Sequence, residues 1–217
     1  MLDFSLTQEV DMIDEKKLAI LEKEVKENPH SIFAHHRLAI GYWQAGKLEE
    51  ALKTFENLLK MDPPNFEVRI NYGTLLAQMG RFEEAKEQFE TALKIYPSSP
   101  EALVNLGLVN FHLGNLEEAK NYYQKALELK PDWPPVLVNL STVHIERGEF
   151  EEAIACCQKA LEIDPNFSMA YNNLAVAYYH AGQIDKAAEA LKKAKELGYP
   201  VPESLEKMIQ DALHAKG

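Results

Sequence analysis

The sequence predicts an all-α protein in which tandem helix–turn–helix repeats stack into a solenoid. Five segments of the chain align with one another without a gap, and each begins 34 residues after the one before it. Self-similarity at a period of about 20–50 residues indicates a repeat architecture. The five segments are HRLAIGYWQAGKLEEA, INYGTLLAQMGRFEEA, VNLGLVNFHLGNLEEA, VNLSTVHIERGEFEEA and NNLAVAYYHAGQIDKA.

Three residue types keep the same period through all five units. A glycine, an alanine and a proline recur at fixed places, and chance does not explain such regular spacing. The glycines are Gly46, Gly80, Gly114, Gly148 and Gly182. The alanines are Ala51, Ala85, Ala119, Ala153 and Ala187, and the prolines are Pro29, Pro63, Pro97, Pro131 and Pro165.

The third unit shows how one repeat is expected to fold. Ser99 can cap a first helix in which Pro100 takes the first position, where its missing N–H costs nothing. Apolar residues at helical spacings continue to Gly114, which permits the chain to reverse. A second helix is expected over about 117–129, and it ends before Pro131 because a residue that precedes proline is disfavoured in a helix.

The remaining segments complete the predicted domain organisation. We expect an N-terminal tail over 1–13 and a single solenoid over 14–217. Asp14 can cap a lone first helix, and the last segment contains an apolar stripe that would cover the end of the array. The predicted parts of the solenoid are a lone helix 14–30, repeats 32–65, 66–99, 100–133, 134–167 and 168–201, and a capping helix 202–217. The stripe comprises Leu205, Met208, Ile209, Ala212 and Leu213.

The order of residues within a unit resembles the tetratricopeptide repeat (TPR) family. Between residues 106 and 131, a leucine, a small residue, an aromatic residue, Gly, Ala, an aromatic residue, Ala and Pro follow one another in the family's order. The resemblance covers roughly residues 32–199. It implies a right-handed superhelical solenoid whose first helices line a concave groove, and the family mostly presents binding surfaces for other proteins.

Asparagine recurs at one position of four successive first helices. The column is Asn71, Asn105, Asn139 and Asn173, with Arg37 at this position in the first unit. A side-chain amide offers both donors and an acceptor, so it can match a peptide group in both directions. The resemblance places the column on the groove wall, where we expect it to face water and to bind the main chain of a partner. Hydrogen bonding to a neighbouring helix is the open alternative.

The same resemblance assigns further aliphatic, aromatic and polar side chains to the groove. Exposed apolar surface of this kind is uncommon on a soluble protein without a binding role. The flanking groove positions are His36, Ile40, Trp43, Ile70, Thr74, Leu108, Phe111, Val138, Thr142 and Tyr179.

Composition excludes several classes of partner. The chain has 34 acidic against 23 basic residues, for a net charge of −11, which disfavours nucleic acid and anionic lipid as partners. No segment approaches the roughly 20 apolar residues that membrane insertion requires. The first residues carry acids where a secretory signal would carry bases. We therefore expect a cytoplasmic protein.

The sequence gives no sign of catalysis, a cofactor or a metal site. Cys156 and Cys157 are adjacent, a spacing that fits neither a disulfide framework nor a metal or redox motif. The seven histidines form no ligand cluster, and no phosphate loop or nucleophile elbow is present. We expect no enzyme activity, no metal and no cofactor.

The sequence thus predicts a non-catalytic adaptor or scaffold whose groove binds an extended peptide or a helix of a partner protein. Two alternatives are a structural scaffold that self-associates and a regulatory subunit of a separate enzyme. Residues 1–13, in which Leu2, Phe4, Leu6 and Val10 stand in a polar chain, are a candidate occupant of the same groove.

Overall fold

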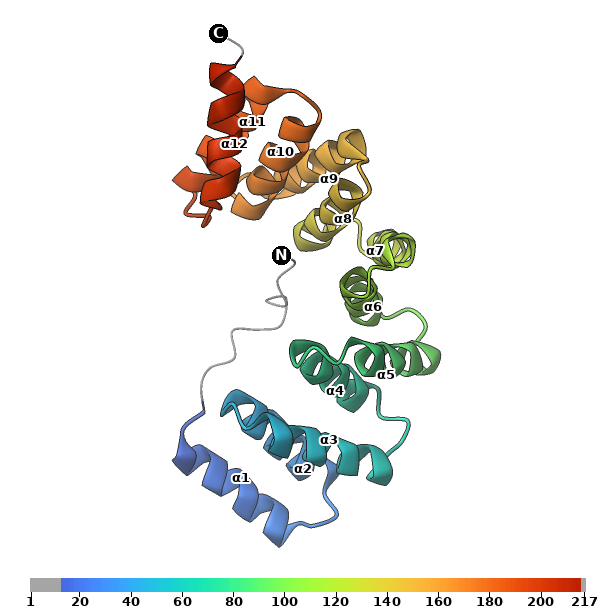
Figure 1. Ribbon diagram of the computed structural model, residues 1–217. Helices are drawn as coiled ribbons and strands as arrows, with labels where there is room; N and C mark the ends of the chain where they lie inside the picture. Colours follow the sequence, from blue (N-terminus) through green and yellow to red (C-terminus); the bar gives the residue numbers. More distant parts are fainter. Residues whose placement is uncertain (1–12, 216–217) are drawn as a thin grey trace. The chain divides into compact units, whose positions relative to one another are not determined.

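The structure is a computed structural model that describes residues 13–215, and all regular elements among them are α-helices. The chain divides into two compact units, of which the first ends at Leu113 and the second begins at Gly114. Figure 1 labels the helices of both. We call them unit 1 and unit 2. The predicted tail, residues 1–13, lies outside the described residues except for Ile13. A single solenoid over 14–217 stays a prediction.

Unit 1 consists, in its described part, of a lone helix, two helical hairpins and the first helix of a third repeat. Each helix contacts the next along the chain, and α4 also contacts α6. The helices are α1 (Glu15–Glu27), α2 (Ile32–Gln44), α3 (Leu48–Met61), α4 (Phe66–Gln78), α5 (Phe82–Ile95) and α6 (Pro100–His112).

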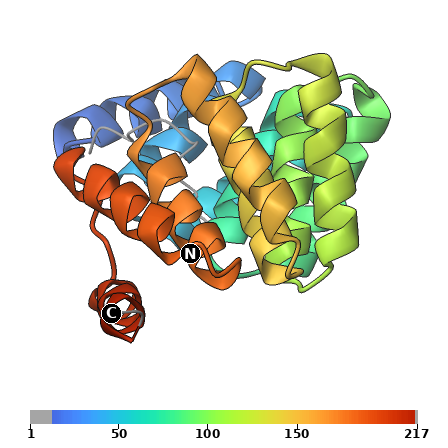
Figure 2. The ribbon, with the colours of Figure 1, turned by 90° about the horizontal axis from the view of Figure 1, so that it is seen from above.

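Unit 2 begins with the second helix of that repeat, continues with two hairpins and ends with an additional helix. Its successive helices contact one another, and α8 also contacts α10. Figure 2 shows the last helix, α12, nearly along its axis beside α11. The helices are α7 (Leu116–Leu129), α8 (Pro134–Glu146), α9 (Phe150–Ile163), α10 (Ser168–His180), α11 (Ile184–Glu196) and α12 (Glu203–His214).

Local sequence determines where these helices begin and end. The side chain of Asp14 accepts a hydrogen bond from Lys17 N at 2.7 Å, and Ser99 Oγ accepts one from Ala102 N at 3.1 Å, so both predicted caps are confirmed. The five glycines that recur between first and second helices have φ angles of 72 to 79°. L-residues rarely adopt this conformation, which explains why glycine recurs at the turn.

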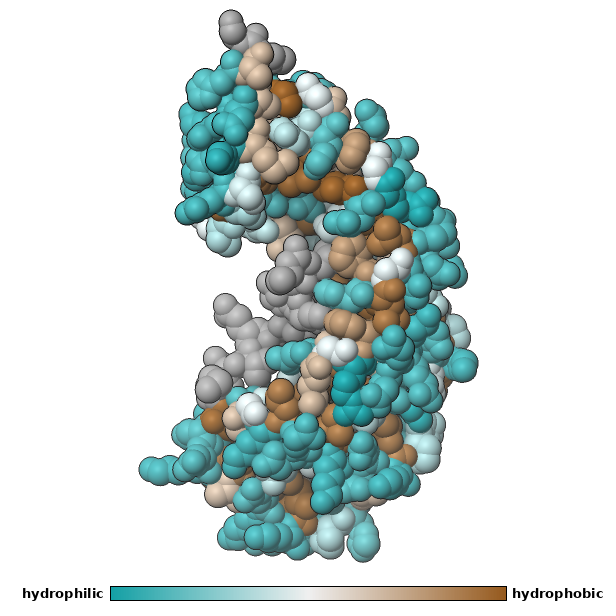
Figure 3. Space-filling view, viewed as in Figure 1, coloured by the Kyte–Doolittle hydropathy of each residue, from teal (hydrophilic) through white to brown (hydrophobic). Residues whose placement is uncertain are grey.

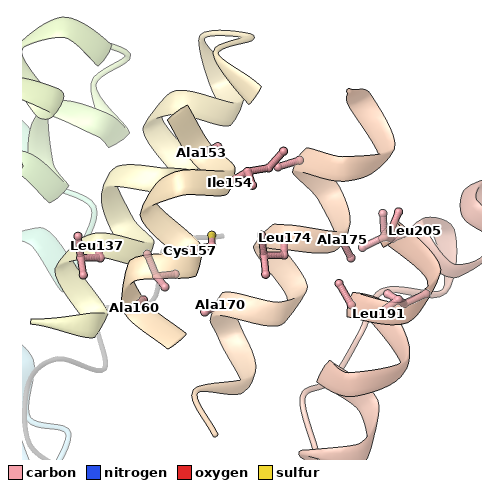
Figure 4. Close-up of a cluster of buried hydrophobic side chains, with 14 of the residues drawn as sticks. Leu137, Ala153, Ile154, Cys157, Ala160, Ala170, Leu174, Ala175, Leu191 and Leu205 are labelled. Carbon is pink, nitrogen blue, oxygen red and sulfur yellow. The ribbon is translucent and has the colours of Figure 1, made fainter. Parts of the chain in front are cut away.

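The core of unit 2 is a continuous cluster formed by five successive helices. Figure 4 shows Leu137 of α8, Cys157 of α9, Leu174 of α10, Leu191 of α11 and Leu205 of α12 in this cluster. Alanines lie between the larger side chains and allow the helices to approach closely.

The last helix covers the end of this core with only part of its predicted stripe. Leu205 and Ile209 of α12 are buried, but Met208 is 40% exposed, so the expectation that Met208 packs with them is wrong. Residues 205 and 209 lie one turn apart on the same side of the helix, whereas residue 208 points away from their centre line.

One face of the molecule is mainly polar. On the face shown in Figure 3, hydrophilic side chains predominate and hydrophobic ones form smaller groups between them. In the part of the chain that the structure describes, no helix is both long and apolar enough to span a bilayer.

Candidate functional site

In unit 1, polar contacts join the first helices of successive repeats. Asn71 Nδ2 of α4 lies 2.9 Å from His36 Nε2 of α2, and Trp43 Nε1 donates to Gln78 Oε1 at 2.7 Å. Burial lowers the pKa of His36, although the charge of Glu67 partly opposes the shift. The neutral imidazole is therefore favoured, and its Nε2 can accept from the asparagine amide.

Arg37, which holds the column position in the first repeat, interacts with α1. Its Nη1 donates to both carboxylate oxygens of Glu24, at 2.7 and 3.0 Å, and its guanidinium lies 5.6 Å from the centre of the Phe33 ring. Phe33 is 67% exposed. The first repeat thus presents an exposed aromatic ring with a cation above it.

Several of the predicted groove residues in unit 1 are only half-buried. Ile40, Ile70, Asn105 and Phe111 belong to this group, as do His36, Trp43 and Asn71. No hydrogen bond of the Asn105 side chain is present among the described residues. Thr74 and Leu108 are buried, and the Thr74 hydroxyl donates to the carbonyl oxygen of Ile70 at 2.8 Å.

In unit 2, the amide of Asn173 joins α10 to α8. Asn173 Nδ2 lies 2.9 Å from Thr142 Oγ1, 3.0 Å from Ser141 Oγ and 3.4 Å from the carbonyl oxygen of Val138. Both hydroxyls donate to Val138 O, at 2.7 Å from Ser141 and 3.1 Å from Thr142. Because their hydrogens are used in this way, the hydroxyl oxygens can accept from the asparagine.

The two units use the same repeat position in these contacts. His36 and Val138 occupy equivalent places, and each is approached by the asparagine that stands 35 residues later in the chain. The column asparagine of one repeat therefore reaches back to the first helix of the preceding repeat, in both unit 1 and unit 2.

Unit 2 also contains a buried donor and a buried acceptor without partners. Asn139 Nδ2 on α8 and Asn172 Oδ1 on α10 make no hydrogen bond in the described structure. The residues are 4% and 9% exposed, respectively. The other end of the Asn172 amide donates to Asn173 Oδ1 at 3.4 Å. Leaving a buried polar group unpaired costs about 1–3 kcal/mol, so a partner for either atom would be stabilising.

The expectation that all four asparagines face water is wrong for Asn139 and Asn173, which are buried. For Asn173 the reason is the pair of hydroxyls on the preceding first helix, which accept its amide hydrogens. Val138 is buried too, while Thr142 and Tyr179 are half-buried. Whether these residues line a binding groove stays a prediction.

Sequence reasoning did not predict the hydrogen bonds of Ser141 and Asn172 with Asn173. The adjacent hydroxyl residues at 141 and 142 and the adjacent amides at 172 and 173 stand within otherwise apolar helices. Paired polar residues in such surroundings are the signal that identifies a network connecting two helices.

A charged cluster in unit 2 lies at the turn between α8 and α9. Glu149 accepts from His144 Nδ1 at 2.6 Å and from Arg147 Nε at 2.8 Å. Arg147 also contacts Glu117 at 2.6 Å. The hydrogen bonds from Arg147 and His144 lower the pKa of Glu149 to about 2. Each member has a partner, and no group of three or more metal-ligating side chains is present among the described residues.

Comparison with known families identifies the repeats. Models of the tetratricopeptide repeat match residues 42–106, 98–166 and 156–189, so that together they cover residues 42–189 without a gap. No curated protein matches the chain.

Solved structures with the same architecture include several repeat proteins. The structure is similar to YrrB, a TPR protein with an unusual peptide-binding site, at 26% identity and a TM-score of 0.68, over 90% of this chain and 97% of YrrB. MamA is 28% identical with a TM-score of 0.69, over 74% of this chain and 94% of MamA. PilW, a type IV pilus biogenesis factor, is 25% identical with a TM-score of 0.76, over 84% and 86% of the two chains.

Proposed function

The chain belongs to the tetratricopeptide repeat family, and we propose that it is a non-catalytic interaction module that binds an extended segment of a partner protein. The observation that carries the proposal is the unpaired donor of Asn139 and the unpaired acceptor of Asn172 in unit 2. Both atoms are buried, so the partner lies along the first helices of unit 2 and supplies main-chain groups to them once the two side chains rotate outward.

A peptide group supplies the two hydrogen-bond partners that Asn139 and Asn172 lack. Its carbonyl oxygen accepts from Asn139 Nδ2, and its N–H donates to Asn172 Oδ1. Because every residue except proline carries both main-chain groups, recognition of this kind tolerates many sequences. Asparagines that bind the main chain therefore suit a module that holds segments of varied sequence.

The half-buried residues of unit 1 form a separate surface that offers contacts of a second kind. Ile40, Ile70 and Phe111 offer apolar surface, and Asn105 offers an amide without a hydrogen-bond partner among the described residues. Aromatic and aliphatic anchors contribute most of the affinity in many interfaces, whereas polar groups fix register. A segment that binds to unit 1 accordingly carries apolar side chains, and we place the interaction in the cytoplasm.

Binding of peptides selected from a random twelve-residue library tests this function. Asn139→Leu keeps the approximate shape of the side chain and removes the unpaired donor, so the free energy of unfolding stays equal or rises. Peptide affinity falls about tenfold, which corresponds to the loss of one hydrogen bond. The matched control is Asn121→Leu on α7, whose side chain is exposed.

Replacing single peptide amides by esters tests main-chain recognition directly. An ester lacks the N–H, so at the contact with Asn172 it weakens binding to the unchanged protein. The same ester has no effect on binding to Asn172→Leu. Equal affinity of the unchanged protein, Asn139→Leu and Asn172→Leu for every selected peptide contradicts the proposal.

A further inference from the structure

We infer that residues 1–12 bind in cis to the first-helix face of unit 1 and compete there with partner segments. This face consists of Ile40, Trp43, Ile70, Asn105 and Phe111 on α2, α4 and α6. The inference rests on the proposed function, because it assigns a regulatory occupant to the same type of surface. Residues 1–12 lie outside the described residues, and the described contacts of Ile13 determine where this segment joins unit 1.

Ile13 fixes the start of the segment beside α2. Its side chain packs against the buried cluster of Leu18, Leu21 and Leu38. Its Cδ1 atom lies 3.7 Å from the place that a Cβ of Gly41 would occupy. Gly41 lies on the same helical turn as Ile40 and Trp43 but points toward α1. Residues one and two apart on a helix point in different directions, so the segment has to pass around the side of α2 to reach the face.

Twelve residues suffice to cross the face. A fully extended chain spans at most about 3.3–3.6 Å per residue, or roughly 40 Å for this segment. Packed helices are spaced about 8–10 Å apart, so the steps from α2 to α4 and from α4 to α6 amount to roughly 20 Å. The hydrogen bonds between α2 and α4 show that these first helices are direct neighbours.

The sequence of the segment matches an extended ligand with one apolar side. Leu2, Phe4 and Leu6 alternate with Asp3, Ser5 and Thr7. In an extended chain, alternate side chains point in opposite directions, so the three apolar residues share one side. Residues 2 to 6 extend over about 14 Å, so that side contacts apolar residues of two neighbouring first helices at a time, while the polar side faces water.

Tethering gives even a weak interaction a regulatory effect. A short flexible linker produces an effective concentration of about 1 mM, so a segment with a Kd of about 100 µM in trans occupies its site most of the time in cis. A partner peptide that needs the same face then binds about tenfold more weakly than it does to a chain without the segment.

Fluorescence of Trp43 reports directly on the face. The chain has two tryptophans, and Trp133→Phe leaves Trp43 as the reporter. In this background we expect deletion of residues 1–12 to increase acrylamide quenching of Trp43, and a synthetic peptide of residues 1–12 to reverse the increase. The full-length variant Leu2→Ser/Phe4→Ser/Leu6→Ser behaves like the deletion. The control variant Ser5→Ala/Thr7→Ala, which changes the other side of the segment, behaves like the parent.

Three outcomes overturn the inference. Equal quenching of the parent, the deletion and the serine variant contradicts any contact with Trp43. Failure of the synthetic peptide to restore protection at millimolar concentration contradicts binding to this face. Protection that disappears on dilution, together with a dimer in sedimentation, assigns the contact to a second copy instead of to cis binding.

The same variants separate this inference from the proposed function. If the deletion variant binds selected library peptides with dependence on Asn139, but shows no change at Trp43, the interaction module stands and the cis segment does not. If neither the library peptides nor the segment bind, both proposals fail. Circular dichroism of each variant verifies that the helices are retained.

Discussion

The ring of Phe89 packs directly on the backbone of Gly73. A Cβ atom added to Gly73 on α4 would lie 2.7 Å from Cε1 and 2.9 Å from Cζ of the ring, which is 1% exposed. The first and second helices of this repeat thus approach as closely as a glycine permits. The ring cannot give way easily because the surrounding interior is close-packed.

Gly73→Ala should therefore destabilise the protein although alanine is the better helix former. Overpacking costs about 1–3 kcal/mol, against about 1 kcal/mol gained in helix propensity, and we expect a net loss of up to about 2 kcal/mol in unfolding free energy. Urea denaturation measures it. Gly41→Ala is the control, because its Cβ meets Leu21 Cδ1, the end of a flexible side chain, at 2.6 Å. An equal loss in both variants would contradict this explanation.

Asn173 and Asn105 share a repeat position but should differ in their contribution to stability. Asn173→Ala removes the contacts to Ser141, Thr142 and Val138, so we expect a loss of about 1–2 kcal/mol. Asn105→Ala removes no side-chain hydrogen bond among the described residues, so the free energy of unfolding should change by less than about 0.5 kcal/mol. Thermal and urea unfolding of the two variants test the difference. A larger loss for Asn105→Ala would show that the assignment of structural and free amides is reversed.

The low pKa of Glu149 makes part of the free energy of unfolding depend on pH in the acid range. Hydrogen bonds from Arg147 and His144 lower this pKa to about 2, below the ordinary value of 4.5. The folded state then binds the proton less readily than the unfolded state does, so the contribution is complete above about pH 4.5 and is lost as the pH falls toward 2.

Glu149→Gln should remove this component of the pH dependence. We expect the variant to be less stable than the parent at pH 7 and to lose less stability between pH 5 and pH 3, as measured by urea denaturation at each pH. Glu128→Gln is matched in charge and lies at an exposed position of α7. If Glu149→Gln and Glu128→Gln show the same pH profile, the cluster with Arg147 and His144 does not contribute.

The elements that sequence predicts well depend on local chemistry. The caps at Asp14 and Ser99 and the turn at Gly114 follow from a few adjacent residues, and the structure has each of them. Such features need no knowledge of the rest of the chain, because a capping side chain and a glycine act on the backbone within four residues of themselves.

The environment of the asparagines was less predictable because it depends on a residue one repeat earlier. Asn173 meets hydroxyls at 141 and 142, and Asn71 meets the ring of His36. The periodic pattern contains the asparagines but not the identity of these acceptors. Whether an amide is engaged or unpaired therefore varies from repeat to repeat within one column.

The two adjacent cysteines should both be unreactive in the folded protein. Burial raises the pKa of Cys156 to about 11 and that of Cys157 to about 12, from an ordinary value of 9.0. Since the thiolate is the reactive form, its fraction at pH 8 falls about 100-fold for Cys156 and about 1,000-fold for Cys157. We expect slow modification by a disulfide reagent in buffer and rapid modification in urea. Cys156→Ala and Cys157→Ala assign the two rates, and rapid labelling of either thiol in the folded chain would contradict a packing role and reopen thiol chemistry in α9.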